Sequence, residues 1–239
     1  MTDLLINLLA SLVAGTAVWL AQRLLRLRRA ARTRAFFAVK PGDQCLLSVS
    51  RHFSSPSERS VHRQDVAALV ELGSIVRTCG GEPELLPFDD DSPGLGRLTE
   101  FCVGGPTTSP RTAAHVRSML PGVVYHTDVQ QISVGGSTFR REPRVEEYCL
   151  VARVWGPSGG RPVFIIGGQV APSNLAAARF LSRSHRELYR RYGAAKPFCL
   201  MLKVVESGTY GPDFTEIAAD VSAEAFQPVP TVEEPTPAP

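Results

Sequence analysis

Hydrophobic positions divide the chain into one long uncharged stretch, several short apolar runs and a few segments with helical periodicity. Residues 4–22 carry no charge. Short apolar runs bounded by turn residues predict strands, here at 44–50, 84–88, 100–103, 122–126, 147–155, 162–166 and 198–205, with an edge segment at 214–221. Apolar residues at a spacing of three to four predict helices, here at 61–79, 110–119 and 174–192.

The alternation of strands and helices predicts a Rossmann-like α/β fold, a three-layer sandwich with a mostly parallel sheet. Strands that are apolar along nearly their whole length are typical of a sheet covered on both faces. Residues 131–134 and 138–141 flank Gly135 and Gly136, which predicts a β-hairpin insertion. We expect the α/β domain to span 44–227 and the tail at 228–239, with five Pro in twelve residues, to be disordered.

The uncharged stretch predicts a transmembrane anchor at residues 1–22. The 19 residues from 4 to 22 span about 28 Å at about 1.5 Å per residue, close to a hydrocarbon core of roughly 30 Å. Trp19 lies near the end of the stretch, where interfacial aromatic residues are common. A cleaved signal peptide and an interfacial amphipathic helix are the alternatives. In a signal peptide the positive charge precedes the apolar run, whereas here Asp3 precedes it.

Positive charge is concentrated directly after this stretch. The arginines there are Arg23, Arg26, Arg28, Arg29, Arg32 and Arg34. They predict a basic juxtamembrane helix and linker at 23–43. The positive-inside rule then predicts a single-pass protein of the cell membrane, with the N-terminus outside and the α/β domain in the cytoplasm. Residues 36–227 contain 20 Lys and Arg against 20 Asp and Glu. Because a nucleic-acid-binding domain normally carries its own basic excess, we expect no nucleic-acid partner.

The cysteines and histidines give no metal-site pattern. The five cysteines are widely spaced, without a C-x-x-C pair, and four lie in apolar runs typical of buried strands. Core packing is therefore the favoured interpretation, and disulfides or metal ligation are the minor alternatives. The five histidines lack ligand spacing such as H-E-x-x-H. We therefore predict neither a metal nor a cofactor.

An internal similarity is the most informative feature. Residues 101–115 align without gaps on residues 164–178. Each segment has the pattern of a strand followed by a Gly-Gly pair, a polar loop and an Ala-rich helix. A glycine pair lets a ligand approach the backbone, and the N–H groups at a helix start favour an anion. Neither loop matches the dinucleotide or P-loop fingerprint. The alternative is that both glycine pairs only form tight turns.

Candidate ligand-binding residues lie where the predicted strands end. Hydroxyl and guanidinium groups suit phosphate or carboxylate, and an acidic group after the second strand can hold a ribose hydroxyl. The alternative for each loop is a solvated turn. The predicted set is Ser50, Arg51, Ser54, Ser55, Asp89, Gly104, Gly105, Thr107, Thr108, Gly167, Gly168, Gln169 and Asn174.

Three functions remain open from the sequence. The first is a membrane-tethered sensor or effector that binds a small anionic, nucleotide-like ligand. The second is a scaffold that acts through protein partners or self-association, motivated by the anchor and by basic residues along 179–191. The third is a hydrolase of nucleotide or glycosidic bonds that uses Asp89, Glu146 or Glu147 as acid or base. No catalytic residue is assigned.

Overall fold

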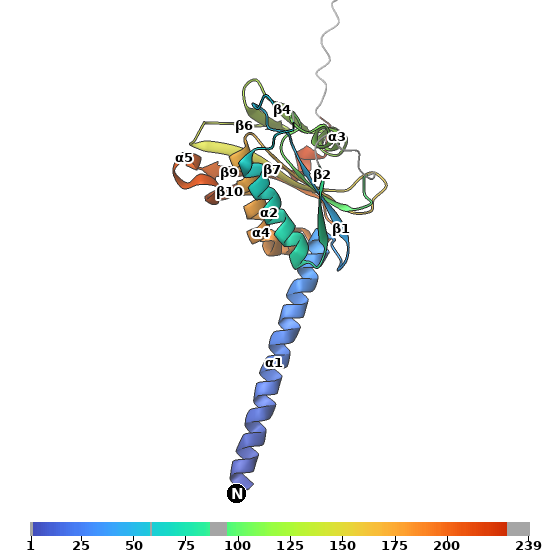
Figure 1. The fold of residues 1–239 in the computed structure, drawn as a ribbon, viewed down its shortest axis with the longest axis vertical. Helices are drawn as coiled ribbons and strands as arrows, with labels where there is room; N and C mark the ends of the chain where they lie inside the picture. The colour runs from blue at the N-terminus through green and yellow to red at the C-terminus, as the bar shows by residue number, and fades with distance from the viewer. Residues whose placement is uncertain (1, 58, 87–94, 229–239) are drawn as a thin grey trace, which may run out of the picture.

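A long N-terminal helix, α1 (Thr2–Phe37), projects from an α/β domain (Figure 1). The computed structural model describes residues 2–57, 59–86 and 95–228, except for the side chains of residues 2–11 and 13. Among the described residues, no helix has a sufficiently long apolar stretch to cross a membrane. Within the predicted anchor, the side chains of residues 4–11 and 13 lie outside the described part. The predicted tail from 229 onward and Asp89 lie outside it as well.

A seven-stranded sheet forms the centre of the described domain, in the order β10-β9-β7-β8-β3-β1-β2. The pairings show that β2, β1, β3, β8 and β9 run in one direction, whereas β7 and β10 run in the other. The sheet is therefore mostly parallel by strand direction, as predicted. The strands are β1 (Gln44–Val49), β2 (Glu82–Leu86), β3 (Thr99–Val103), β7 (Glu146–Val154), β8 (Val163–Gly168), β9 (Phe198–Val205) and β10 (Thr215–Asp220).

Each face of the sheet is covered by its own apolar cluster. Helices α2 (Arg63–Thr78) and α4 (Ala171–Tyr192) pack on one face together with the end of α1. Helix α3 (Pro110–Met119) packs on the other face. Because successive strand residues point to opposite faces, Phe101 joins the first cluster and Cys102 the second.

The layer beside α3 is completed by a second, three-stranded sheet. Strands β4 (Val123–His126), β5 (Gln131–Val134) and β6 (Ser137–Arg140) pair in antiparallel order. The predicted hairpin is confirmed as β5 and β6. It does not extend the main sheet, because Ile132 and Val134 point into the same apolar cluster as α3.

Three short helical elements were not predicted: α5 (Ser207–Tyr210), η1 (Gly211–Asp213) and α6 (Ser222–Ala225). Each has three or four residues, too few to show a helical period. All five cysteines are buried and free, as the core interpretation predicted.

The last turn of α1 belongs to the domain core. Phe36 and Phe37 are fully buried. Arg153 of β7, also fully buried, donates from Nη1 to the carbonyl of Phe36 (3.0 Å) and from Nη2 to the carbonyls of Gly193 (3.0 Å) and Lys196 (2.7 Å). Its guanidinium therefore ties α1 to the segment that follows α4.

Candidate functional site

The candidate site lies where the carboxyl ends of three neighbouring strands meet. The chain leaves β1 and β8 for α2 and α4 on one face of the sheet, and it leaves β3 for α3 on the other face. In open α/β sheets, such a divergence opens a crevice at the carboxyl edge, and ligands bind there.

The two similar sequence segments, 101–115 and 164–178, begin in adjacent strands, and their aligned residues are paired in the sheet. Phe101 of β3 pairs with Phe164 of β8, the aligned residue, and their rings stack at 4.9 Å between centroids. The two glycine loops consequently leave the sheet side by side, and the amide of Gly104 donates to the carbonyl of Ile166 (2.9 Å). The two following helices nevertheless pack on opposite faces.

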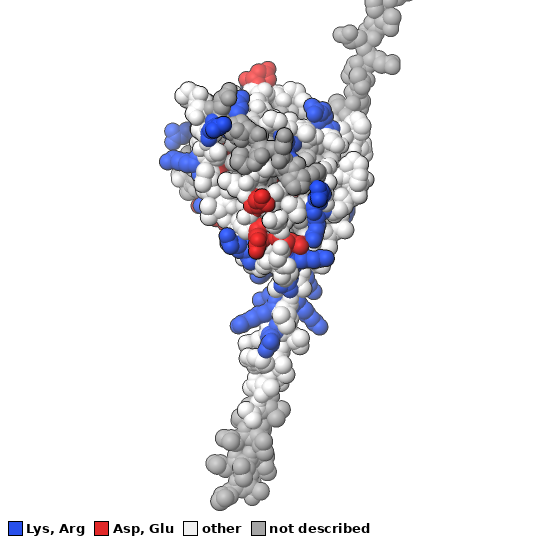
Figure 2. All heavy atoms as spheres, turned by 45° about the vertical axis from the view of Figure 1, so that its right-hand side comes forward, with Lys and Arg blue, Asp and Glu red and all other residues white. Residues whose placement is uncertain are grey.

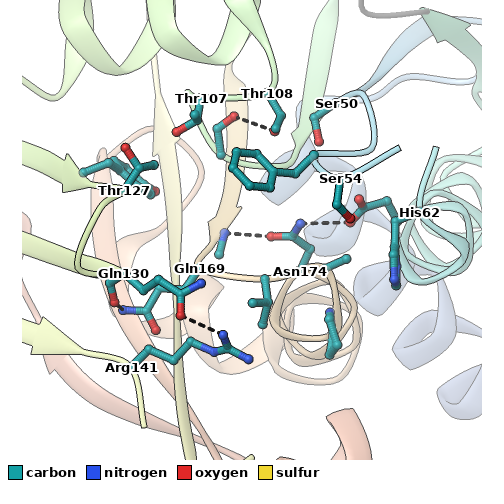
Figure 3. A pocket seen from close by; sticks show the side chains of 18 of the residues that line it. Ser50, Ser54, His62, Thr107, Thr108, Thr127, Gln130, Arg141, Gln169 and Asn174 are labelled. Atoms are coloured by element: carbon teal, nitrogen blue, oxygen red, sulfur yellow. Dashed lines mark hydrogen bonds between the residues drawn. The ribbon is translucent and has the colours of Figure 1, made fainter. Parts of the chain in front are cut away.

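A pocket of about 400 Å³ opens at this edge (Figure 3). Its walls come from the loops after β1, β3 and β8, from the start of α2, and from β4, β5 and residue 141 after β6. The residues that line it are Ser50, Arg51, His52, Phe53, Ser54, His62, Asp65, Gly105, Thr107, Thr108, Tyr125, His126, Thr127, Gln130, Gln131, Ile132, Arg141, Gly168, Gln169, Val170, Ala171, Pro172 and Asn174.

Most of the predicted set lines this pocket. The predicted residues found there are Ser50, Arg51, Ser54, Gly105, Thr107, Thr108, Gly168, Gln169 and Asn174. Ser55, Gly104 and Gly167 do not line it, and Asp89 lies outside the described residues.

Three of the four glycines provide space for the protein's own side chains. A Cβ at Gly104, whose φ is +109°, would clash with the Ser50 side chain. A Cβ at Gly167 would lie 2.6 Å from the Tyr125 hydroxyl, and one at Gly168 would clash with Ser173. Only Gly105 has no atom closer than 3.5 Å to such a Cβ. Close approach of a ligand is therefore not needed to explain the other three.

Backbone amides in the second glycine loop already have internal partners. The Gly168 amide donates to Asn174 Oδ1 (2.7 Å), the Gln169 amide to the Tyr148 carbonyl (3.0 Å) and the Val170 amide to Ser173 Oγ (3.3 Å). The expectation of an anion cradle built from free amides is thus wrong for this loop, because two side chains at the start of α4 and the Tyr148 carbonyl of β7 satisfy them. In the first loop, the amides of Gly105 and Thr107 have no partner among the described residues.

Gln169 connects the two sheets. Its Oε1 accepts from the Tyr148 amide (2.9 Å), and its Nε2 donates to the carbonyls of Gln130 (2.9 Å) and Phe139 (2.9 Å). Both amide hydrogens are used, so its part in the site is to hold the small sheet over the pocket. The Tyr125 hydroxyl makes a similar contact, donating to the Gly167 carbonyl (2.9 Å), and burial raises the pKa of Tyr125 well above its usual value.

Two arginines face the pocket, and they differ in their partners. Arg141 donates to Oε1 of the buried Glu147 (2.9 Å) and to Gln130 Oε1 (2.8 Å). Arg51 pairs with no carboxylate among the residues that the structure describes. Arg51 is therefore the cation available to an anionic ligand.

Two histidines that the predicted set omitted lie beside Arg51. The rings of His52 and His62 are 5.1 Å apart between centroids. Nδ1 of His52 accepts from the Ser54 amide (3.2 Å), and Nδ1 of His62 accepts from the Gln64 amide (3.2 Å), which makes His62 the N-cap of α2. Any proton on either ring is consequently carried by Nε2.

Asp65, which the predicted set also omitted, is a carboxylate with 4% of its surface exposed. Asn174 Nδ2 donates to its Oδ1 (2.8 Å). Burial raises the pKa of Asp65, while the bond from Asn174 and the neighbouring imidazoles of His62 and His52 oppose part of the rise. No sequence pattern singles out Asp65, because a charged residue in the first turn of a helix is usually solvated.

Family models, curated proteins and solved structures yield no match to this chain. The functional argument therefore depends on the geometry of the pocket.

Of the carboxylates considered for catalysis, the two that the structure describes, Glu146 and Glu147, do not line the pocket. Glu147 is 3% exposed and paired with Arg141, while Glu146 accepts from the Tyr148 hydroxyl (2.9 Å) and Lys203 (3.4 Å). Asp89 lies outside the described residues.

A buried polar cluster on the α3 face has the donor types of a metal site. Glu100, Cys102 and His115 each place a ligand atom within 4.8 Å of the others. However, both Glu100 oxygens accept from Arg111. Burial alone would raise the pKa of Glu100, but the bonds from Arg111 and His115 outweigh it and lower the pKa to about 2. The guanidinium thus supplies the positive charge that a metal would bring, and the cluster is best described as a buried ion pair.

Proposed function

We propose that this chain is a membrane-anchored sensor or effector whose α/β domain binds a small anionic, nucleotide-like ligand. The observation that carries the proposal is Arg51 at the pocket, with no carboxylate partner among the described residues. A guanidinium forms charge-assisted, often bidentate bonds to phosphate or carboxylate. Ser50, Ser54, Thr107 and Thr108 add hydroxyl donors at the same pocket.

The balance of charge in the pocket supports an anion. Among the described lining residues, Asp65 is the single carboxylate, while Arg51 has no carboxylate partner and Arg141 is paired with Glu147. The protein would therefore add little repulsion to a negatively charged group held near Arg51.

The apolar part of the pocket supports a ligand with a ring system. Phe53 lines the pocket with 72% of its surface exposed, and Ile132, Val170 and Pro172 line it as well. Stacking of a nucleobase on an aromatic side chain contributes about 1–3 kcal/mol per base. A nucleotide would use both the cationic and the apolar parts.

The membrane part of the proposal depends on the sequence of α1. Residues 4–22 would form the anchor, and the arginines from Arg23 to Arg34 would lie at the cytoplasmic surface. Figure 2 shows positive side chains around α1 where it meets the domain. Such residues favour anionic lipid headgroups.

One observation favours ligand binding over the scaffold hypothesis. The basic residues of α4 that motivated a partner surface are partly neutralised within the chain: Arg179 pairs with Asp213 (2.7 Å) and Arg191 with Asp220 (2.5 Å). Less of this positive charge remains for an acidic partner.

A thermal-shift screen of the full chain in detergent tests the proposal. The probes are the four common nucleoside 5′-monophosphates, with inorganic phosphate for comparison. We expect at least one nucleotide to raise the melting temperature of the wild type. Arg51→Gln should lose the shift, whereas Arg117→Gln, at an exposed residue of α3 away from the pocket, should keep it. A folded wild type that responds to none of the nucleotides would contradict the proposal.

A further inference from the structure

Asp65 presents one unsatisfied carboxylate oxygen to the pocket. Its Oδ1 accepts from Asn174, whereas its Oδ2 accepts no hydrogen bond from the described residues. The side chain is 4% exposed and lines the pocket, so its remaining accessible surface faces the cavity.

The surrounding structure holds this carboxylate in place. Asn174 is itself fixed, because its Oδ1 accepts from the Gly168 amide (2.7 Å) while its Nδ2 donates to Asp65 (2.8 Å) (Figure 3). Asp65 thereby links the start of α2 to the start of α4 and the end of β8. A rigidly held acceptor loses little entropy when a ligand binds.

A buried carboxylate with a single donor is incompletely solvated. An ionised carboxylate offers about four acceptor positions, and burial of a charge without hydrogen bonds is costly. A donor supplied by a ligand would therefore form a strong, charge-assisted bond to Oδ2. Phosphate alone has no such donor to offer when fully ionised.

We infer that Asp65 accepts a hydrogen bond from a sugar hydroxyl of the ligand, so the ligand class is a phosphorylated sugar, nucleotides included. The phosphate lies toward Arg51 and the sugar toward Asp65. This inference rests on the proposed anion-binding function and adds the group that selects the sugar. A carboxylate that holds ribose hydroxyls is a general solution in α/β nucleotide sites, but here the residue is at the start of α2 and not after the second strand.

Titration calorimetry with two probes tests the inference. The full chain in detergent is titrated with adenosine 5′-monophosphate and with its 2′,3′-dideoxy analogue. For the wild type, we expect removal of the hydroxyls to weaken binding by about tenfold or more, the value of a hydrogen bond to a charged group. Asp128→Asn, an exposed residue outside the pocket, should show the same ratio.

Substitution of Asp65 should abolish the discrimination. In Asp65→Ala the two probes should bind within about threefold of each other, and Asp65→Asn, which keeps the shape and the bond to Asn174, should give an intermediate ratio. Equal affinities in the wild type, or an unchanged ratio in Asp65→Ala, would overturn the role of Asp65. If both probes still require Arg51 in that case, the anion-binding function stands; if neither probe binds the wild type, that function fails as well.

Discussion

At the residue scale, three of the four glycines at the carboxyl ends of β3 and β8 are explained by side chains that occupy the space where a Cβ would lie. Gly168 illustrates this, because Ser173 and Asn174 lie where its Cβ would be. At the aligned residue in the other loop, Gly105, a Cβ would make only ordinary contacts, the nearest with the Gly168 carbonyl oxygen at 3.5 Å. Substitutions of Gly168 and Gly105 can therefore be compared directly.

We predict that Gly168→Ala destabilises the protein by about 1–3 kcal/mol, the usual cost of overpacking, because Ser173 and Asn174 must move. Gly105→Ala should change the free energy of unfolding by less than about 0.5 kcal/mol, as expected where no contact is broken. Urea denaturation of the full chain in detergent measures both. Equal effects of the two substitutions would contradict the packing argument.

The buried pair of Glu100 and Arg111 predicts a dependence of stability on pH. The folded pKa of Glu100 is about 2 against an ordinary value of 4.5. A lowered carboxyl pKa contributes stability above the ordinary value, and that stability is lost as the pH falls from about 4.5 toward 2.

Glu100→Gln should therefore cost about 3–5 kcal/mol at pH 7, as expected when one partner of a buried pair is removed. The difference from the wild type should shrink as the pH falls toward 3. Denaturation curves from pH 7 to pH 3 test this, with Glu82→Gln on the exposed edge strand as the control. A difference that stays constant with pH would argue against an ionised Glu100.

At the element scale, the end of α1 is part of the domain core. Phe36 and Phe37 pack edge to face at 4.9 Å, and Thr33 Oγ1 lies 3.2 Å from Nε2 of His185 in α4. Because Arg153 also bonds the Phe36 carbonyl, a displacement of α1 has to disturb β7 and α4. This contact gives a physical route between α1 and the rest of the domain.

We predict that Phe36→Ala destabilises the domain by about 3–5 kcal/mol, since it removes a fully buried aromatic side chain. Leu27→Ala, at a residue of α1 that is 54% exposed, should leave the domain's unfolding midpoint unchanged. Chemical denaturation of both full-length variants in detergent provides the comparison. Similar midpoints would show that α1 is not built into the core.

The sequence predicted the positions of strands and helices more successfully than the contacts between them. Strand and helix positions followed from apolar periodicity, and the repeat of residues 101–115 at 164–178 anticipated two neighbouring loops. The sequence did not indicate that β4 to β6 would form a separate sheet over the pocket. For this reason Gln169 was interpreted as a ligand-binding residue, although it bridges the two sheets.

Part of the candidate site could be predicted from the sequence, and part could not. Polar residues directly after strands, such as Ser50, Arg51 and Thr107, were found because the carboxyl ends of parallel strands converge. Asp65 and His62 lie at the start of α2, and only the packing of α2 against α4 brings them to the pocket. Contacts between helices that are distant in sequence leave no local pattern.

At the scale of the whole molecule, the proposal requires the domain to lie on the cytoplasmic side of a membrane. In cells that express the full chain, we predict that protease added to spheroplasts leaves the domain intact and that alkaline carbonate leaves the protein in the membrane pellet. Replacement of the six arginines between 23 and 34 by Gln should expose a substantial fraction of the domain to protease. Release into the supernatant would contradict the anchor, and cleavage of the wild-type domain would contradict its orientation.

The central claim is that the pocket recognises negative charge through Arg51, and one measurement tests it directly: the ratio of dissociation constants for adenosine and adenosine 5′-monophosphate. We predict that the monophosphate binds the wild type at least about tenfold more tightly, and that Arg51→Gln reduces this ratio to near one. Equal affinity of the wild type for the two compounds, or a ratio unchanged by Arg51→Gln, would contradict the account.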